Sequence, residues 1–588
     1  MRYQKVRRTI RRRQSRLISS FRDLANNLDK FVVGRFGHLK VVRKFLLSWM
    51  LFWLSLAFIT VWQMVNLSGY FQHIEPVSGG IYNEGILGTL SNVNPIYATS
   101  NVDSSLSRLI FAGLFTYNQH NQLVGCLAGG YSISTNGRVY TVKLRPGLTW
   151  QDGRPLTAAD VVFTFDTIQN PNAQSPLYSS WQNVKVAAPN SLTVTFTLKN
   201  PLASFPYSLT VGIIPKHILG GVNPVDLRSQ AFNNTDPIGA GPFAWQQIQV
   251  NGNTPENASE TIALSPFRHY VLGKPKLAEF IVNAIANKQQ LINEFTANQL
   301  NGIAGLNSVP RQIAKHKGYI INSPLLTAGN YVFFKTSSGV LGNAVVRKAL
   351  VLASNPQSII ASLGYATKPV NEPLLIGQLG YNPKYAQLTN QLSQAKALLN
   401  QNGWIVGRGN IRYKGSQQLA FNLVTTNIKE NRQVASELKS QWSLLGANVS
   451  LVSESAQTYQ TALEGHNYDS TLNGISIGVD PDVFAYWDGS QFDPRSSGLN
   501  LSEYNNSNAN QALEAGRTRL DPALRVIKYQ PFLADWQADA PALGLYQPRA
   551  LYITRQPVYG LSNHPINTPE DRYDNIVNWK ILTAAVTD

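Results

Sequence analysis

Residues 150–162 read WQDGRPLTAADVV, the longest ordered pattern in the chain. Thr157 and Asp160 stand three residues apart, which is the spacing of a capping box at the start of a helix. Leu156 and Val161 flank this box, as a hydrophobic staple requires. We therefore expect a helix to begin after Thr157. The side chains that this helix is expected to bury are Val161, Val162, Phe165 and Ile168.

Strand patterns lie on both sides of that helix. Residues 139–144 form an apolar run that ends in the turn residues of 145–147, which is typical of a strand. In residues 191–198 apolar side chains alternate with threonines, so one face of a second strand is expected to be buried. Two strands separated by a helix indicate a mixed α/β fold.

The second half of the chain favours helices. Apolar residues recur at a spacing of three to four in 343–354, 393–402 and 430–445. The last two patterns run into Gly403 and Gly446, which can end a helix because glycine readily adopts positive φ. Strands are predicted between these helices, and no repeat of fixed period interrupts the pattern. The strands in question are 419–425 and 448–452.

Size and composition describe a well-packed body and give no sign of metal or redox chemistry. The 588 residues exceed what one core normally supports, and 43% hydrophobic with 14% charged residues indicates a folded chain. Cys126 is the sole cysteine, which excludes an internal disulfide framework and a multi-cysteine metal site. The eight histidines are scattered without metal-ligand spacing, so we expect no metal and no cofactor.

The positive charge is concentrated at the N-terminus. Before Phe45 there are 14 Lys and Arg residues, and the acidic residues there are Asp23 and Asp29. This segment therefore carries a net charge of +12, which is most of the +18 of the whole chain. Residues 45–67 carry no charge, are long enough to cross a bilayer, and contain Trp49, Trp53 and Trp62, which suit its interfaces. The positive-inside rule then predicts that residues 1–44 are a basic cytoplasmic tail and that the main body is extracytoplasmic.

A cleaved signal peptide is the alternative to this transmembrane anchor. Its charged region is normally short and its apolar stretch shorter than 45–67, so we favour an uncleaved, single-pass anchor in the cell membrane. The basic tail is expected to mark topology and to contact anionic lipid, with RNA binding as a weaker reading; no nucleic acid partner is expected. Residues 68–78 are predicted to be a linker.

Several motifs of the body resemble one protein family over nearly its full length. Residues 90–95 (LSNVNP), 108–114 (RLIFAGL), 127–128 (LA), 140–144 (YTVKL) and 150–162 follow its opening order, and 239–243 (GAGPF), 346–350 (VRKAL) and 395–404 continue it more weakly. The family is that of ABC-importer extracytoplasmic solute-binding proteins for oligopeptides, dipeptides and nickel, the family 5 solute-binding proteins.

The resemblance implies an α/β, two-lobed periplasmic-binding-protein-like clamshell, of type II with an extra subdomain, preceded by one transmembrane helix. Lobe I would comprise 79–330 and 485–588, and lobe II would be the inserted 331–484. It also implies a binding protein rather than an enzyme, which closes by a hinge motion on a peptide or peptide-like ligand and delivers it to ABC transporter permease subunits. A membrane-tethered ligand sensor or cell-envelope interaction protein on the same fold is the alternative.

In peptide-binding members of that family, main-chain groups of two segments hold an extended ligand. The resemblance places these segments at Thr99, Ser100 and Asn101 and at Asn473, Gly474 and Ile475. Such pairing ignores side-chain identity, so one site accepts many sequences. The competing reading is that both segments are ordinary loops.

The position that is an amine-binding aspartate in those relatives is Ile477 here. An apolar side chain cannot neutralise a buried ammonium group. Either Asp480 or Asp482 substitutes for it, or the ligand is blocked, uncharged or not a peptide. Trp487 is a candidate stacking face, although an aromatic residue at such a place is more often part of the core.

A third hypothesis is an exported serine hydrolase. Residues 474–478 fit G-x-S-x-G around Ser476, and Asp539 and His564 follow in hydrolase order. That motif needs a strand-to-helix turn, which the nearby Pro481 disfavours. Residues 239–244 similarly imitate a dinucleotide loop, but a proline stands where helix amides should face a phosphate.

Overall fold

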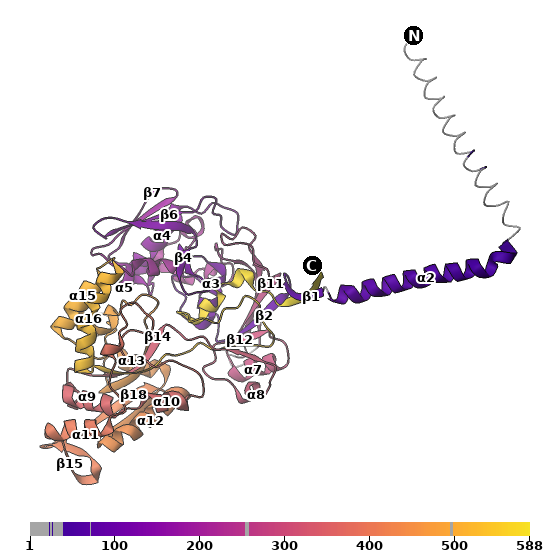
Figure 1. Ribbon diagram of the computed structural model, residues 1–588. Coiled ribbons are helices and arrows are strands. Elements are labelled where there is room, and N and C mark those ends of the chain that lie inside the picture. The colour runs from indigo at the N-terminus through magenta and orange to yellow at the C-terminus, as the bar shows by residue number, and fades with distance from the viewer. Residues whose placement is uncertain are drawn as a thin grey trace. The chain divides into compact units, whose positions relative to one another are not determined.

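The computed structural model describes residues 23, 26, 39–70, 72–252, 254, 258–493 and 498–587. Most of the predicted basic tail therefore lies outside the described residues. The chain divides into one unit of Met1–Pro76 with Thr583–Asp588 and a second, larger unit of Val77–Leu582. The second unit holds three large sheets and all the candidate site residues (Figure 1).

The first unit contains a long apolar helix, α2 (Leu39–Tyr70). Its stretch Arg43–Asn66 is 24 residues long, has a mean hydropathy of 1.9 and buries none of its residues against protein. By length and composition this stretch can cross a membrane, and it contains almost all of the predicted 45–67 span. The predicted linker is partly a strand, because β1 (Gln72–Val77) pairs with β23 (Leu582–Thr587).

A seven-stranded sheet forms the first part of the larger unit. Its strand order is β13-β22-β12-β2-β11-β10-β9, and the central β2 (Ile81–Leu87) pairs in parallel with both of its neighbours. Helices α3 (Asn101–Ile110) and α7 (Lys288–Thr296) contact β2. The other strands are β9 (Phe243–Asn251), β10 (Ser259–Pro266), β11 (Glu279–Ile285), β12 (Gly302–Ala304), β13 (Ile320–Asn322) and β22 (Tyr552–Thr554).

A four-stranded sheet carries the helix that the opening motif predicts. The helix α4 (Ala158–Gln169) begins after Thr157, whose N–H donates to Oδ2 of Asp160 at 2.8 Å, so the capping box is confirmed. Val161 is fully buried as expected, whereas Val162 is only half-buried because it lies at the margin of the helix's inner face. The strands, in order, are β5 (Ala128–Ile133), β6 (Val139–Leu144), β8 (Thr193–Thr197) and β7 (Lys185–Asn190).

The third part is a five-stranded sheet with order β19-β18-β20-β14-β21. The predicted helices are present as α9 (Ala344–Ala353), α11 (Leu392–Gln401) and α12 (Lys429–Leu445). Gly446 ends α12 with a φ of 97°, as its position predicted. The strands are β14 (Ala328–Phe334), β18 (Ala420–Thr426), β19 (Asn448–Glu454), β20 (Ser470–Ser476) and β21 (Ala542–Tyr546).

Helices α15 (Ser507–Arg517) and α16 (Pro522–Asp539) belong with the five-stranded sheet. They pack in one core with Tyr331 and Phe333 of β14, and α16 leads directly into β21 of that sheet. In Figure 1 they lie side by side next to β14. The sequence-based boundary at 484/485 does not coincide with a boundary between sheets, because Trp487, α15, α16 and β21 pack with β14 and β20.

The chain passes between the two larger sheets along two segments. Residues 323–327 lead from β13 to β14, and residues 547–551 lead back from β21 to β22. The two segments pair with each other through a bridge between Leu325 and Arg549, and the Leu326 N–H donates to the Pro548 carbonyl at 2.8 Å. We call these two segments the crossing segments.

Shorter elements connect the main ones. The three-stranded β15 (Ile405–Val406), β16 (Arg412–Lys414) and β17 (Gln417–Gln418) form a separate small sheet, and β3 (Phe115–Tyr117) pairs with β4 (Leu123–Gly125). The remaining short helices are α5 (Tyr178–Trp181), α6 (Lys216–Leu219), α8 (Arg311–Ala314), α10 (Pro356–Ser362), α13 (Ala456–Glu464) and α14 (Phe484–Trp487).

Candidate ligand-binding site

A cavity of about 620 Å³ lies where the crossing segments meet both larger sheets. Its wall combines residues of β2, α3 and α7 from the first part with Asn330 of β14 and the first turn of α12 from the third. Its volume falls within the range of small-molecule sites. The polar and charged lining residues are Asn101, Ser105, Lys288, Asn307, Ser308, Asn330, Tyr365, Lys429, Glu430, Asn431, Gln433, Arg549, Tyr552 and Arg572.

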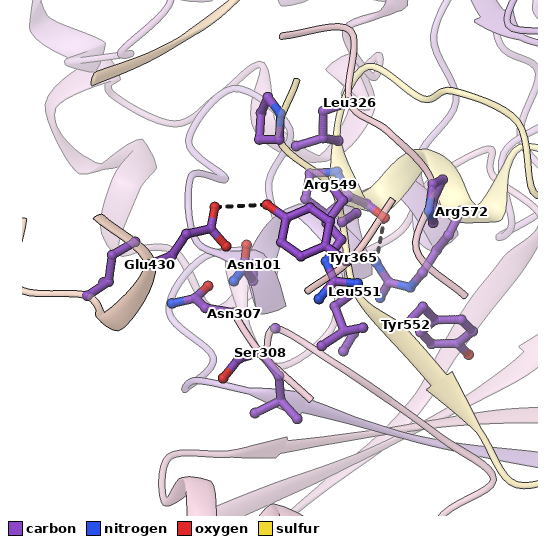
Figure 2. A pocket seen from close by; sticks show the side chains of 18 of the residues that line it. Asn101, Asn307, Ser308, Leu326, Tyr365, Glu430, Arg549, Leu551, Tyr552 and Arg572 are labelled. Carbon is purple, nitrogen blue, oxygen red and sulfur yellow. Dashed lines mark hydrogen bonds between the residues drawn. The ribbon is translucent and has the colours of Figure 1, made fainter. Parts of the chain in front are cut away.

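Arg549, Tyr365 and Glu430 form a connected cluster in this cavity (Figure 2). The Tyr365 hydroxyl donates to Oε1 of Glu430 at 2.9 Å, and the Tyr546 hydroxyl donates to the same oxygen at 2.8 Å. The Arg549 guanidinium lies 3.7 Å from the centre of the Tyr365 ring, in cation–π contact. Glu430 therefore fixes the ring against which the arginine stacks.

Positive charge predominates in the lining. Among the described lining residues, the only carboxylate is that of Glu430. The cationic side chains are those of Lys288, Lys429, Arg549 and Arg572. Arg572 is already neutralised, because its guanidinium lies 2.7 Å from the fully buried carboxylate of Glu84.

Arg549 differs from Arg572 because no carboxylate pairs with it. Among the described residues, no Asp or Glu oxygen lies within 4.0 Å of its guanidinium and no hydrogen bond leaves that group. Its side chain is half-buried, and this burial lowers the pKa of the guanidinium although Tyr365 and Glu430 oppose the shift. A desolvated cation without a close counter-charge is unusual, and its nitrogen donors remain available.

The first predicted segment reaches the cavity at one residue. Asn101 lines the cavity and is the first residue of α3. Ser100 caps that helix: its hydroxyl oxygen accepts from the Asp103 N–H at 3.0 Å, and its carbonyl accepts from the Ser104 N–H. Thr99 is exposed just before the cap. The helix therefore uses the carbonyl of Ser100 that a ligand strand would otherwise need.

The second predicted segment lies on β20, one strand away from the cavity lining. Asn473, Gly474 and Ile475 pair with β14, and Gly474 stands opposite Asn330, which lines the cavity. On its other edge β20 pairs with β18 only at Ser470 and Thr471. Within the described residues, no strand pairs with that edge of Asn473, Gly474 and Ile475.

The remaining predicted site residues belong to the protein interior. Ile477 is buried, and its N–H donates to the Thr327 carbonyl at 3.0 Å. Asp480 forms a two-point ion pair with the buried Arg525, at 2.6 and 2.7 Å. Trp487 is fully buried and meets the Trp536 ring edge to face, so it packs within the core beside β14. None of these three residues lines the cavity.

The three residues of the hydrolase hypothesis, Ser476, Asp539 and His564, do not form a catalytic triad. The Asp539 carboxylate accepts from the hydroxyl of Tyr504 and the amide of Asn506, and His564 instead pairs with Asp574 at 2.6 Å. The glycines of 239–243 serve packing, because a Cβ at Gly239 would come within 2.0 Å of the Ile110 carbonyl oxygen. Among the described residues, no group of three or more His, Cys, Asp or Glu could hold a metal ion.

Sequence reasoning missed the residues that dominate the cavity. Tyr365 follows α10, Glu430 opens α12, Lys288 opens α7 and Arg549 lies on a crossing segment. No local motif joins four segments so far apart in the chain.

Comparisons with known proteins agree with this architecture. The chain is 24% identical over 527 residues to the oligopeptide-binding protein AppA of Bacillus subtilis, covering 86% of this chain and 92% of AppA. It is 26% identical to a putative ABC transporter peptide-binding protein of Brucella ovis over 79% of this chain and 86% of that protein.

Solved structures match the fold. CtaP of Listeria monocytogenes, described as an ABC transporter substrate-binding protein, superposes with a TM-score of 0.73 at 24% identity, covering 86% of this chain and 99% of CtaP. NikZ of Campylobacter jejuni, solved in complex with Ni(L-His), gives a TM-score of 0.72 at 22% identity, covering 85% and 99%. The expected α/β, periplasmic-binding-protein-like fold is thus confirmed.

The family assignment rests on a model that matches more than half of the chain. Residues 122–495 match the middle region of the bacterial extracellular solute-binding proteins, family 5. The proteins of this family bind solutes and are not enzymes. The chain therefore belongs to the family 5 bacterial extracellular solute-binding proteins.

Proposed function

We propose that this protein captures a peptide or peptide-like ligand outside the cell and delivers it to the permease subunits of an ABC importer. The observation that carries the proposal is the cavity of about 620 Å³ lined by residues of both larger sheets and of the crossing segments. The similarity to the oligopeptide-binding protein AppA and to the Brucella ovis ABC transporter peptide-binding protein supports the ligand class and the type of transporter.

The proposal requires two lobes that move relative to each other. We assign the seven- and four-stranded sheets to lobe I and residues 328–546, with the five-stranded sheet, to lobe II. The paired crossing segments are the proposed hinge, because hinges are short segments at the ends of elements that absorb the change in φ and ψ. The cavity lies beside this hinge, so closure would enclose a ligand held there.

The open edge of β20 supports recognition through the main chain. Asn473, Gly474 and Ile475 are paired only with β14, and an extended peptide can add to the free edge as a further strand. Asn101 lies at the cavity and offers an amide to the same ligand. Because Ile477 is apolar and Asp480 is held by Arg525, neither residue can neutralise a ligand ammonium group.

We further propose that α2 anchors the protein in the cell membrane through residues 45–67. Residues 1–44 would then be cytoplasmic, in contact with anionic lipid, and the body from Val77 onward extracytoplasmic. The uncharged run of Phe45–Leu67 directly after the basic residues supports this orientation.

The test begins with the full-length protein purified in mild detergent. Mass spectrometry of whatever small molecule is released on denaturation should identify peptides or peptide-like compounds. Addition of that compound should raise the unfolding temperature in a concentration-dependent way, since a ligand that binds only the folded state stabilises it. Deletion of the gene should abolish uptake of the same compound by cells. Ligand binding with unchanged uptake would instead favour the sensor function, and absence of any peptide ligand would refute the proposal.

A further inference from the structure

We propose that a second contact between the proposed lobes, separate from the crossing segments, is a latch that keeps the protein closed. The inference rests on the proposed function, because it needs the two lobes assigned there. The latch consists of Ala203 and Ser204, which follow β8 of the four-stranded sheet, and of Asp482 and Arg517, which belong to the part with the five-stranded sheet. In Figure 1, α15, which ends at Arg517, lies next to the four-stranded sheet.

The main-chain part of the latch uses the end of a helix. Arg517 is the last residue of α15, and the last carbonyls of a helix have no hydrogen-bond donor within the helix. The Ala203 N–H donates to the Arg517 carbonyl at 2.9 Å. A helix-end carbonyl of one proposed lobe is therefore paired with an amide of the other, and separation of the lobes would leave both groups to water.

The side-chain part of the latch is centred on Asp482. Its Oδ2 accepts from the Ser204 hydroxyl at 2.8 Å and lies 3.2 Å from a guanidinium nitrogen of Arg517. The Arg517 guanidinium also stacks on the Phe484 ring, 4.1 Å from its centre, which holds the arginine beside the carboxylate. A hydroxyl that donates to a carboxylate makes a charge-assisted bond, about twice as strong as a neutral one. Asp482, a candidate ligand contact by sequence, thus has a partner on the opposite lobe.

The latch is small enough to open. The Arg517 and Asp482 side chains keep 27% and 11% of their surface exposed, so water reaches this contact. Leu520 adds an apolar contact at the turn of Gly137, where an added Cβ would stand 3.4 Å from the leucine Cδ1. Water can replace the two hydrogen bonds when the lobes separate, so the latch biases the equilibrium between open and closed forms without fixing it.

The position of the latch determines how it affects ligand binding. Its four residues lie outside the cavity lining, so they act on a ligand only through the closed form. A ligand that enters and leaves through the open form stays bound longer when the closed form is more populated. Weakening the latch should therefore speed dissociation. It should also separate the lobes more often in ligand-free protein, which the loss of a ligand contact would not do.

The first experiment measures the separation of the lobes without ligand. Spin labels are attached to cysteines at the exposed positions Lys143 on β6 and Lys528 on α16 of full-length protein in mild detergent, after removal of bound ligand. Pulsed electron spin resonance should give a short and a long distance for wild type. Ser204→Ala removes the hydroxyl bond and keeps the main-chain bond. It should shift the ratio of short to long distances about 10-fold toward the long one.

The matched control is Ser229→Ala. The Ser229 hydroxyl also donates a hydrogen bond, to the Asp226 carbonyl at 2.9 Å, but both residues belong to proposed lobe I. This variant should keep the wild-type ratio. Asp482→Asn removes the charge that binds Ser204 and Arg517, and it should shift the ratio at least as far as Ser204→Ala. The unfolding temperature of each variant shows that it folds.

The second experiment measures binding kinetics by stopped flow, with a mixture of tripeptides as the probe. Ser204→Ala should raise the dissociation rate about 10-fold and change the association rate constant by less than about twofold, because association occurs through the open form. Ser229→Ala should match wild type in both rates.

The outcomes separate the latch from the proposed function. A shifted distance ratio in ligand-free Ser204→Ala supports the latch even if no tripeptide binds. If tripeptides shorten the distance in wild type, but Ser204→Ala and Asp482→Asn keep the wild-type ratio and dissociation rate, the latch is overturned and ligand capture stands. A single distance that neither tripeptides nor variants change would mean that the lobes do not move, and both the latch and capture between two lobes would fail.

Discussion

Asp480 illustrates how a candidate ligand contact becomes a structural residue. Both of its oxygens accept from the guanidinium of Arg525, and both side chains are buried. Replacement by alanine would leave the arginine charge buried and unpaired, which typically costs about 3–5 kcal/mol. We expect Asp480→Ala to lower the free energy of unfolding by that amount, measured by urea denaturation.

Two controls accompany this substitution. Asp226→Ala removes an exposed carboxylate and should change the free energy of unfolding by no more than about 0.5 kcal/mol. Asp480→Ala combined with Arg525→Met removes both charges and should recover part of the loss. Loss of ligand binding with unchanged stability in Asp480→Ala would show that this carboxylate acts on the ligand.

Glu372 is a buried carboxyl group that, among the described residues, has no cationic partner. Burial raises its pKa from 4.5 to about 8, although the Asn382 N–H, which donates to Oε1, opposes the shift. The folded state therefore keeps a proton that the unfolded state has released, so stability falls as the pH rises from about 4.5 to about 8. This contribution is complete below that window and lost above it.

We expect Glu372→Gln to flatten this pH dependence. The free energy of unfolding, measured by denaturant titration at several pH values, should fall less for the variant than for wild type across the window. Glu464 is exposed and serves as the control: Glu464→Gln should follow the wild-type curve. Parallel curves for Glu372→Gln and wild type would refute the assignment.

At the scale of elements, α2 is the clearest case for a test. Apolar side chains are exposed on every side of this helix, and those of Leu54 and Phe58 are more than half exposed. Arginine near the centre of a membrane helix costs about 2.5–3.5 kcal/mol per residue by insertion scales. Leu54→Arg combined with Phe58→Arg should therefore move protein out of the carbonate-resistant membrane fraction, whereas Leu54→Ala with Phe58→Ala should not. An unchanged membrane fraction in the arginine variant would contradict the anchor.

Elements were predictable from the sequence where their signals are local. The capping box at Thr157 and the glycine at 446 defined helix ends within one residue, because both depend on side chains and φ angles at the end itself. The placement of α15, α16 and β21 beside β14 was not predictable, since it depends on the pairing of β21 with a strand more than two hundred residues earlier.

The cavity was the least predictable feature for the same reason. Arg549, Tyr365 and Glu430 come from three distant segments, and only folding brings them together. Of the ligand contacts that the family resemblance predicts, Asn101 lines the cavity, and Asn473, Gly474 and Ile475 lie on the strand that pairs with β14. The resemblance could not place Asp480 in a buried pair, since the partner Arg525 lies in a different helix.

The whole molecule is expected to move when it binds. Two cysteines placed at the exposed positions Lys315 and Lys439, on the two proposed lobes, can carry spin labels, and the native Cys126 is too buried to react readily. Pulsed electron spin resonance should show a change in the distance between the labels when the released ligand is returned. A pair on one lobe, at Lys396 and Lys439, should show no change. Identical distances with and without saturating ligand would contradict hinge closure.

The pairing of the crossing segments has a mechanical consequence. Two crossing segments define an axis between the proposed lobes. The lobes can bend about that axis, whereas the second crossing segment resists twisting and sliding of one lobe against the other. A protease that cut only one crossing segment would leave the two proposed lobes covalently joined. The lobes would then be free to rotate about the one crossing segment that remains. Ligand release by such a nicked protein should be faster even though every side chain of the cavity is still present.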